Sequence, residues 1–175
     1  IKRVQAAVDR GFDSVSQLHA MDTEGLDQAA CFPTHGLFLT DTETMDPALA
    51  TAISRAYNDW LYDFCGADRE RLLGVAMVTL LDIESAVKEA RRAVTDLGFR
   101  GIFLRPNPVG GRNWYHPDYD PLWAECERLN IPVGFHGAAV TAELPSIGQR
   151  FAEYFWRGPM PLSFTDVFPV SLPPK

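Results

Sequence analysis

Between residues 70 and 137, short apolar runs alternate with amphipathic segments, and this alternation restricts the fold more than any other feature. RLLGVAMVTL, FRGIFLRP and NIPVGFH are apolar runs of the kind expected for strands buried on both faces. LDIESAVKEARRAVTDLG and DYDPLWAECERLN lie between them and read as amphipathic helices. Strand, helix, strand, helix, strand with short connections predicts βαβ units in a parallel sheet.

Both amphipathic segments carry signals for helix ends. In the first, Asp82 is expected to cap the start and Gly98 to close the end. Its apolar positions recur at helical spacing: Ile83, Val87, Ala90, Val94 and Leu97. In the second, Asp120 is expected as the cap and Pro121 as the first helical residue. Its expected inner face consists of Leu122, Trp123, Cys126 and Leu129.

The region before residue 70 follows the same order. DQAACFP predicts a strand, and DPALATAISRAYNDWLYDFCG predicts a long helix, with a further helix within residues 13–24. On the long helix we expect one apolar side, formed by Ala50, Ile53, Ala56, Tyr57, Trp60 and Phe64. The count is therefore four βα-type strands, beginning near residues 28, 73, 101 and 131.

The C-terminal stretch breaks this pattern. Five prolines fall in the last 17 residues, and such a density excludes regular helix and central strand. We therefore predict one α/β domain over residues 1–155 and an irregular Pro-rich tail over residues 156–175.

Charge and hydropathy exclude several classes of partner. A net charge of −7 argues against nucleic acid and against an anionic membrane surface. No apolar run approaches the roughly 20 residues that span a bilayer, and the N-terminal residues lack the apolar segment of a signal peptide. Cys31, Cys65 and Cys126 show no CxxC spacing, which favours reduced thiols in a cytoplasmic protein. We expect a small-molecule substrate as the partner.

Polar residues follow the predicted strands at His35, at Arg105 and Asn107, and at His136. In parallel α/β folds, chemistry collects at the carboxyl ends of the strands. An imidazole is a common metal ligand, and a guanidinium grips carboxylates. The alternative is that strand ends are polar because they reach water. The loop NPVGGRNWYHP either forms a wall of a site or covers the adjacent core with its aromatic residues.

Three phrases together are similar to the amidohydrolase-related superfamily, in the branch called amidohydrolase 2. They are LGFRGIFLRPNPVGGRNWYHPDYDPLWAECERLNIPVGFHGA, MDTEGLDQAACFPTHGL and NDWLYDFC with RERLLGVAMVTLLD, and they lie within residues 1–155. That branch includes aminocarboxymuconate-semialdehyde decarboxylase, related ring-acid decarboxylases and TIM-barrel metal-dependent hydrolases. The resemblance implies a partial (β/α)8 TIM barrel of about four βα units, and it does not extend into the segment from Trp156.

The resemblance also implies a divalent metal, usually zinc, at the carboxyl face. His136 in VGFH matches a metal ligand of the family, while Arg105 and His35 match positions on the substrate side, with Asn107 next to Arg105. The metal either activates a water for hydrolysis or polarises the substrate for decarboxylation. The family's paired HxH ligands are expected upstream of Ile1, since this chain contains no HxH, and a later histidine and aspartate are expected downstream.

Two functions compete on these grounds. The first is a metal-dependent hydrolase or decarboxylase acting on a small carboxylated or cyclic substrate, present here as an incomplete barrel. The alternative is a non-catalytic half-barrel that self-associates, because the open edges of a sheet pair readily with another copy. A homo-oligomer is expected on the same argument.

Overall fold

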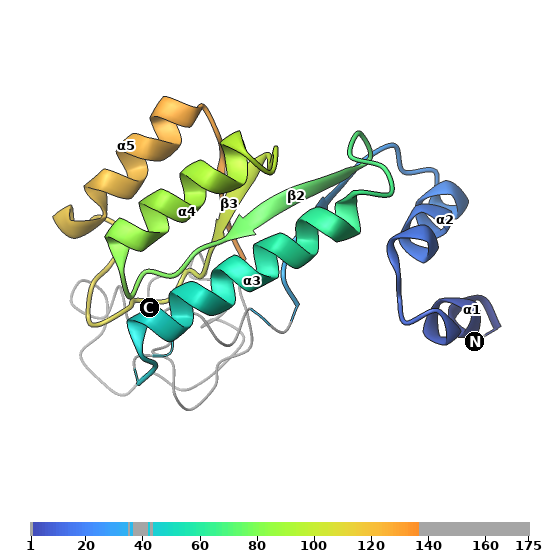
Figure 1. Ribbon diagram of the computed structural model, residues 1–175, viewed down its shortest axis with the longest axis horizontal. Helices are drawn as coiled ribbons and strands as arrows, with labels where there is room; N and C mark the ends of the chain where they lie inside the picture. Colours follow the sequence, from blue (N-terminus) through green and yellow to red (C-terminus); the bar gives the residue numbers. More distant parts are fainter. Residues whose placement is uncertain (1, 35, 37–41, 43, 137–175) are drawn as a thin grey trace, which may run out of the picture.

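The computed structural model describes residues 2–34, 36, 42 and 44–136 of the chain, and these form a parallel α/β layer (Figure 1). Its strands are β1 (Ala29–Cys31), β2 (Leu72–Met77), β3 (Gly101–Leu104) and β4 (Val133–Phe135). They lie in the order β1-β2-β3-β4, and each neighbouring pair is parallel. The predicted α/β fold, four strands of a TIM-barrel type with helical crossovers, is confirmed. The Pro-rich tail of residues 156–175 and the domain boundary before it lie outside the described residues.

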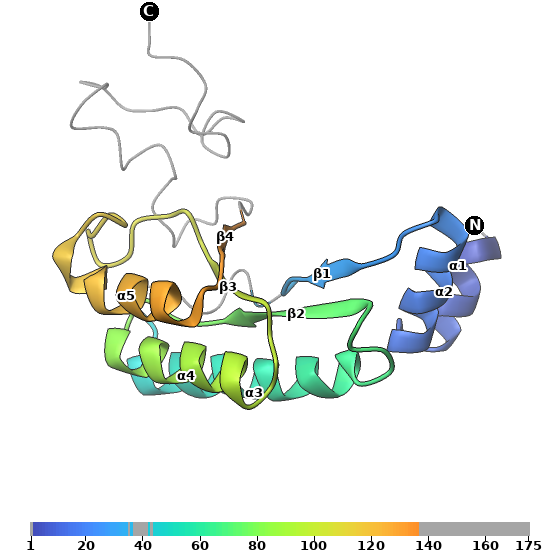
Figure 2. The same ribbon diagram turned by 90° about the horizontal axis from the view of Figure 1, so that it is seen from above.

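The helices are α1 (Lys2–Asp9), α2 (Ser14–Glu24), α3 (Pro47–Cys65), α4 (Ile83–Thr95) and α5 (Asp120–Leu129), with a 3₁₀ turn, η2 (Pro117–Tyr119). Figure 2 shows α3, α4 and α5 along one side of the sheet, with α1 and α2 beyond the amino ends of β1 and β2. None of the helices in the described part of the chain is long and apolar enough to cross a membrane.

Side-chain caps begin α2, α3 and α4, and among them the sequence predicted Asp82. Asp46 accepts from the Leu49 N–H at 2.9 Å, and Asp82 accepts from the Ser85 N–H at 3.2 Å. The expectation for Asp120 is wrong, because this residue lies inside the first turn of α5. The preceding 3₁₀ turn runs directly into that helix, and it is His116 that caps the turn, through Nδ1 and the Asp118 N–H.

The buried face of α3 differs from the predicted one. Ala56 and Trp60 are exposed, the latter by 55%. The Trp60 ring instead makes tilted contacts with the rings of Tyr57 and Phe64 on the same helix. The buried positions are Ala50, Ser54, Asn58, Leu61 and Cys65. Two of these are polar, so an apolar pattern could not reveal them. Each is satisfied by a hydrogen bond, from Ser54 to the Ala50 carbonyl and from Asn58 to the Met77 backbone.

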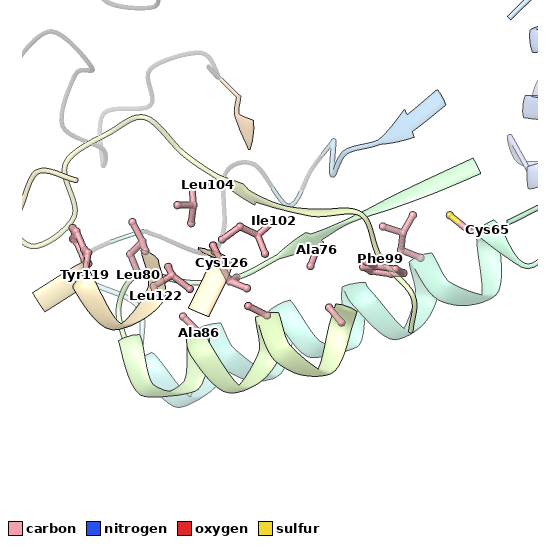
Figure 3. Packing of buried hydrophobic residues seen from close by; sticks show 14 of the residues in the cluster. Cys65, Ala76, Leu80, Ala86, Phe99, Ile102, Leu104, Tyr119, Leu122 and Cys126 are labelled. Atoms are coloured by element: carbon pink, nitrogen blue, oxygen red, sulfur yellow. The ribbon is translucent and has the colours of Figure 1, made fainter. Parts of the chain in front are cut away.

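The main core lies between the sheet and the helices. Figure 3 shows Ala76, Ile102, Ala86 and Cys126 in this layer, all of them members of one buried cluster. Small residues allow close approach: a Cβ on Gly74 would lie 2.5 Å from Cδ1 of Phe99. A second cluster of Val75, Met77 and Phe103 covers the other face of the sheet, since successive strand residues point to opposite faces.

Candidate functional site

Strand register assigns the predicted site residues to one face of the sheet. Phe103 pairs with Met77 on one side and with Gly134 on the other. These three residues share the face opposite the main core, here called the inner face. Counting on by two residues puts Arg105 and His136 on the same face, at the carboxyl ends of β3 and β4. This is the end of a parallel sheet where active sites form.

The backbone of His136 extends the β3–β4 pairing by one residue. Its N–H donates to the Leu104 carbonyl at 3.1 Å, which fixes the position of the side chain at the strand end. The imidazole is exposed and lies 5.9 Å from the Phe32 ring and 6.2 Å from the Phe103 ring. The carboxyl end of β4 therefore places an exposed imidazole against two aromatic rings.

Phe32 supplies one of these rings, and the sequence reasoning missed it. Its ring meets Phe103 edge to face at 6.3 Å and is 37% exposed. Gly134 makes room for it, because a Cβ there would lie 3.1 Å from Cε1 of Phe32. The available signal was strand alternation: Cys31 faces the main core, so the next residue faces inward.

Arg105 and Asn107 follow β3 and are buried, with exposed fractions of 0% and 1%. Arg105 is the largest fully buried side chain in the described residues. A guanidinium keeps its charge in a protein, so this segment brings a positive charge close to the carboxyl ends of the strands. The other predicted substrate residue, His35, lies outside the described residues.

The loop after β3 folds back onto α5 and β4. Arg112 pairs with Asp118 at 2.9 Å, and the Trp123 Nε1–H donates to the Trp114 carbonyl at 3.0 Å. The Trp114 ring stacks on Phe135 with 4.5 Å between centroids, whereas Tyr115 is 67% exposed. Trp114 therefore covers the end of β4, and Tyr115 lies at the surface, where its hydroxyl accepts from Asn113 Nδ2 at 3.1 Å.

The described residues provide part of a metal site at most. Among residues 2–34, 36, 42 and 44–136, no three His, Cys, Asp or Glu side chains are grouped so as to hold a metal ion. His136 fits the role of a single nitrogen ligand, because its ring is exposed at the strand end. Catalytic zinc sites use three protein ligands, so the remaining ligands would have to come from outside these residues.

A family model, several relatives and several solved structures match this chain. The amidohydrolase family model matches residues 4–169, so the expectation that the resemblance stops before Trp156 is wrong. Gamma-resorcylate decarboxylase of Rhodococcus jostii is 39% identical over 95 residues, which are 50% of this chain and 29% of that relative. A gamma-resorcylate decarboxylase of Rhizobium radiobacter is 34% identical over 96 residues, or 52% of this chain and 29% of the relative.

Solved structures agree. The 2,6-dihydroxybenzoate decarboxylase from Rhizobium superposes with a TM-score of 0.63 at 26% identity, covering 80% of this chain and 43% of that one. The 5-carboxyvanillate decarboxylase from Novosphingobium aromaticivorans, complexed with manganese and a nitrobenzoic acid, gives a TM-score of 0.62 at 26% identity, with 70% and 34% covered. The chain thus spans less than half the length of these decarboxylases. Because the family model matches most of the chain, the chain belongs to the amidohydrolase family.

Proposed function

We propose that this chain is the central part of a metal-dependent decarboxylase that acts on a small aromatic carboxylic acid. The observation that carries the proposal is the exposed imidazole of His136 beside the Phe32 ring, at the carboxyl end of the sheet. A flat aromatic wall next to a ligand nitrogen suits a ring-shaped substrate. The names of the relatives, which are decarboxylases of dihydroxybenzoate and carboxyvanillate, support decarboxylation over hydrolysis.

Each residue has a distinct role in this proposal. His136 supplies one nitrogen ligand to a divalent metal. The partly exposed ring of Phe32 holds the substrate ring, and the buried ring of Phe103 supports Phe32 from behind. Arg105 provides positive charge for the carboxylate, with Asn107 and His35 as further substrate residues. When bound, the metal supplies Lewis acidity that polarises the substrate. Loss of CO₂ leaves an electron pair on the ring carbon, so the site also needs a proton donor.

Zinc is the metal expected from the resemblance, whereas the structure from Novosphingobium contains manganese. Imidazole nitrogen suits zinc, and mixed oxygen and nitrogen sites also accept manganese. We propose a divalent metal and leave the choice between zinc and manganese to measurement.

The test follows metal as well as activity. The chain is loaded with Mn²⁺ or Zn²⁺, and bound metal is quantified after gel filtration, with CO₂ release from 2,6-dihydroxybenzoate as the second readout. His136→Ala is expected to lower metal content, and His19→Ala, an exposed residue on α2, serves as the matched control. Equal metal content in wild type and His136→Ala would remove His136 from the ligand set. Full metal loading without CO₂ release from any ring acid would count against decarboxylation by this chain.

A second function is favoured by the edges of the sheet. Within the described residues, β1 and β4 each pair on one side only, and Phe135 at the β4 edge is 44% exposed. We propose self-association of the chain through these edges as the alternative to catalysis, and a homo-oligomer in either case. A monomeric mass by light scattering across a range of concentrations would count against it. The cytoplasmic location stays a prediction.

A further inference from the structure

A small cavity lies at the amino end of the sheet, where the chain enters β2 and β3. The end of α3, the first residues of β2 and the segment between α4 and β3 line it, and its volume is about 20 Å³. Its inner wall is made by buried side chains, those of Cys65, Leu72 and Phe99. Two exposed arginines, Arg69 and Arg100, also line it. The cavity therefore has an apolar base and a positively charged rim.

The guanidinium of Arg69 is held in place by the end of α3. Its Nη2–H donates to the Tyr62 carbonyl at 3.3 Å, and its Cζ lies 4.1 Å from the centroid of the Tyr62 ring. Gly66 leaves room for this group, because a Cβ there would lie 3.4 Å from Nη2. A guanidinium carries five N–H donors, so Arg69 keeps donors for a ligand while its position is fixed.

The charges of Arg69 and Arg100 are not balanced within the described part of the chain, where neither side chain forms an ion pair. The other exposed arginines of this part are each paired with a carboxylate: Arg10, Arg55, Arg91 and Arg128. The chain as a whole has a net charge of −7, so it has acidic residues in excess. Two like charges at one cavity repel each other, and an anion bound there would remove the repulsion.

Helix C-termini carry partial negative charge, and α3 and α4 both end near this cavity. Their last carbonyls are already bonded to the chain that follows. The Cys65 carbonyl accepts from the Asp68 N–H at 3.1 Å, and the Ala93 carbonyl accepts from the Phe99 N–H at 2.9 Å. The two full positive charges of the arginines therefore dominate over the partial charges of these helix ends.

We propose that this cavity binds a small oxyanion, of which inorganic phosphate is the simplest, with the guanidiniums of Arg69 and Arg100 as its partners. A water molecule needs on the order of 10–15 Å³, so the cavity admits one or two oxygen atoms while the rest of the ligand stays at the rim. The planar fork of a guanidinium matches two oxygens of a phosphate or a carboxylate. Two positive charges favour a dianion over a singly charged acid. The site is independent of the proposed decarboxylation, because its test requires neither metal nor ring acid.

Binding of inorganic phosphate to the full chain is measured by titration calorimetry above the second pKa of phosphate, with chloride at equal ionic strength as the background. We expect one saturable site with a Kd on the order of 1 mM. Acetate is titrated in the same way to distinguish the two kinds of oxyanion. Weaker binding of acetate supports phosphate as the ligand, and equal or tighter binding would overturn that assignment in favour of a carboxylate.

Variants separate the site from a general attraction of phosphate to the protein. Arg100→Gln is expected to weaken phosphate binding at least about tenfold, because charge-assisted hydrogen bonds are lost. It is the cleaner of the two changes, since the Arg100 side chain makes no hydrogen bond within the described residues. Arg69→Gln is expected to weaken binding by a similar factor and also to lower the thermal midpoint without phosphate, because its contacts with Tyr62 are lost. Arg55→Gln is the matched control: its side chain is 59% exposed on α3, it lies 3.9 Å from Glu89, and its loss changes the net charge equally.

A second measurement locates the ligand on the chain. Phenylglyoxal modifies arginine side chains, and peptide mass spectrometry reports the rate for each arginine. We expect phosphate to slow the labelling of Arg69 and Arg100 and to leave that of Arg55 unchanged. Equal phosphate affinity in wild type, Arg55→Gln and Arg100→Gln, equal protection of all three arginines, or no saturable binding would each overturn the proposal.

Discussion

Asn58 on α3 is a sensitive point of the fold, and its replacement tests the account of the inner face. The side chain is fully buried, and its amide makes the two backbone hydrogen bonds that a neighbouring strand would make. Oδ1 accepts from the Met77 N–H at 2.8 Å, and Nδ2 donates to the Met77 carbonyl at 2.9 Å. Nδ2 also donates to Glu89 Oε1 at 2.8 Å. Asn58→Asp keeps the shape but removes both N–H donors and places a carboxylate against Glu89.

The magnitude follows from the groups left behind. A buried carbonyl that loses its partner costs about 1–3 kcal/mol. A buried carboxylate that faces another carboxylate adds a comparable or larger penalty, so we expect Asn58→Asp to lower the free energy of unfolding by about 3–5 kcal/mol at neutral pH. Arg92, which holds Glu89 through contacts of 2.6 and 2.9 Å, offsets only part of the repulsion.

The pH dependence of the stability of Asn58→Asp is a second, independent test. Burial and the Glu89 charge raise the folded-state pKa of the introduced carboxyl group above its unfolded value. The loss of unfolding free energy in Asn58→Asp therefore grows as the pH rises through the raised pKa of the new carboxyl group. It shrinks as the pH falls, because the protonated acid can again donate a hydrogen bond. Wild type has no carboxyl group at this position. The difference in the free energy of unfolding between wild type and Asn58→Asp is therefore expected to narrow on acidification.

The assay is urea unfolding followed by far-ultraviolet circular dichroism at several pH values. Asp59→Asn is the matched control, since it removes only an ion pair to Arg92 from a side chain that is 55% exposed, and we expect a loss below about 1 kcal/mol. If Asn58→Asp stays within about 1 kcal/mol of wild type, or if its deficit is independent of pH, then the reasoning from the amide contacts is refuted.

Three further changes test other contacts. Glu125 pairs with Arg91 on α4 at 2.8 Å and with Arg128 on α5 at 2.6 Å. The two arginines lower the pKa of Glu125 from 4.5 to about 2. The stabilisation by these ion pairs is therefore present above pH 4.5 and is lost as the pH falls to about 2. Glu125→Gln is expected to cost about 1–2 kcal/mol at pH 7 and nothing near pH 2; a constant deficit in urea melts would contradict this. Gly74→Ala is expected to cost about 1–3 kcal/mol by overpacking against Phe99, whereas Gly98→Ala, at a φ of +71° with open space, is expected to cost about 1 kcal/mol; the reverse order would contradict the packing argument. Phe32→Leu is expected to raise KM for an aromatic acid and to leave the metal content unchanged. Phe135→Leu, on the other face of the sheet, is expected to change neither KM nor metal content. Equal effects of the two variants on KM would remove Phe32 from the site.

Local sequence signals predicted the parallel sheet, because each strand there is a short apolar run between amphipathic segments. The same reasoning put His136 at a strand end, since NIPVGFH stops at a polar residue. It failed where polar groups are buried: Ser54 and Asn58 lie on the buried side of α3, and no apolar period marks them. The cap at Asp120 failed because a 3₁₀ turn precedes the helix, a feature that depends on how His116 and Pro117 bend the loop.

Phe32 shows why the wall of the site depends on tertiary structure. The sequence pattern DQAACFP suggests a strand without a clear end. In the structure, the pairing of β1 with β2 ends at Cys31, which lies opposite Gly74. Three residues further along β2, the edge of Met77 that a longer β1 would occupy is taken by the Asn58 amide.

Because a helix side chain satisfies that edge, the segment after Cys31 is released from the ladder without leaving Met77 unpaired. It then crosses the inner face closely, since a Cβ on Gly36 would lie 2.7 Å from Sδ of Met77. Phe32 reaches Phe103 and His136 as a consequence. The proposed site therefore depends on a buried asparagine of α3 as much as on the residues that line it, and loss of the Asn58 amide is expected to disturb Phe32 before it disturbs the helices.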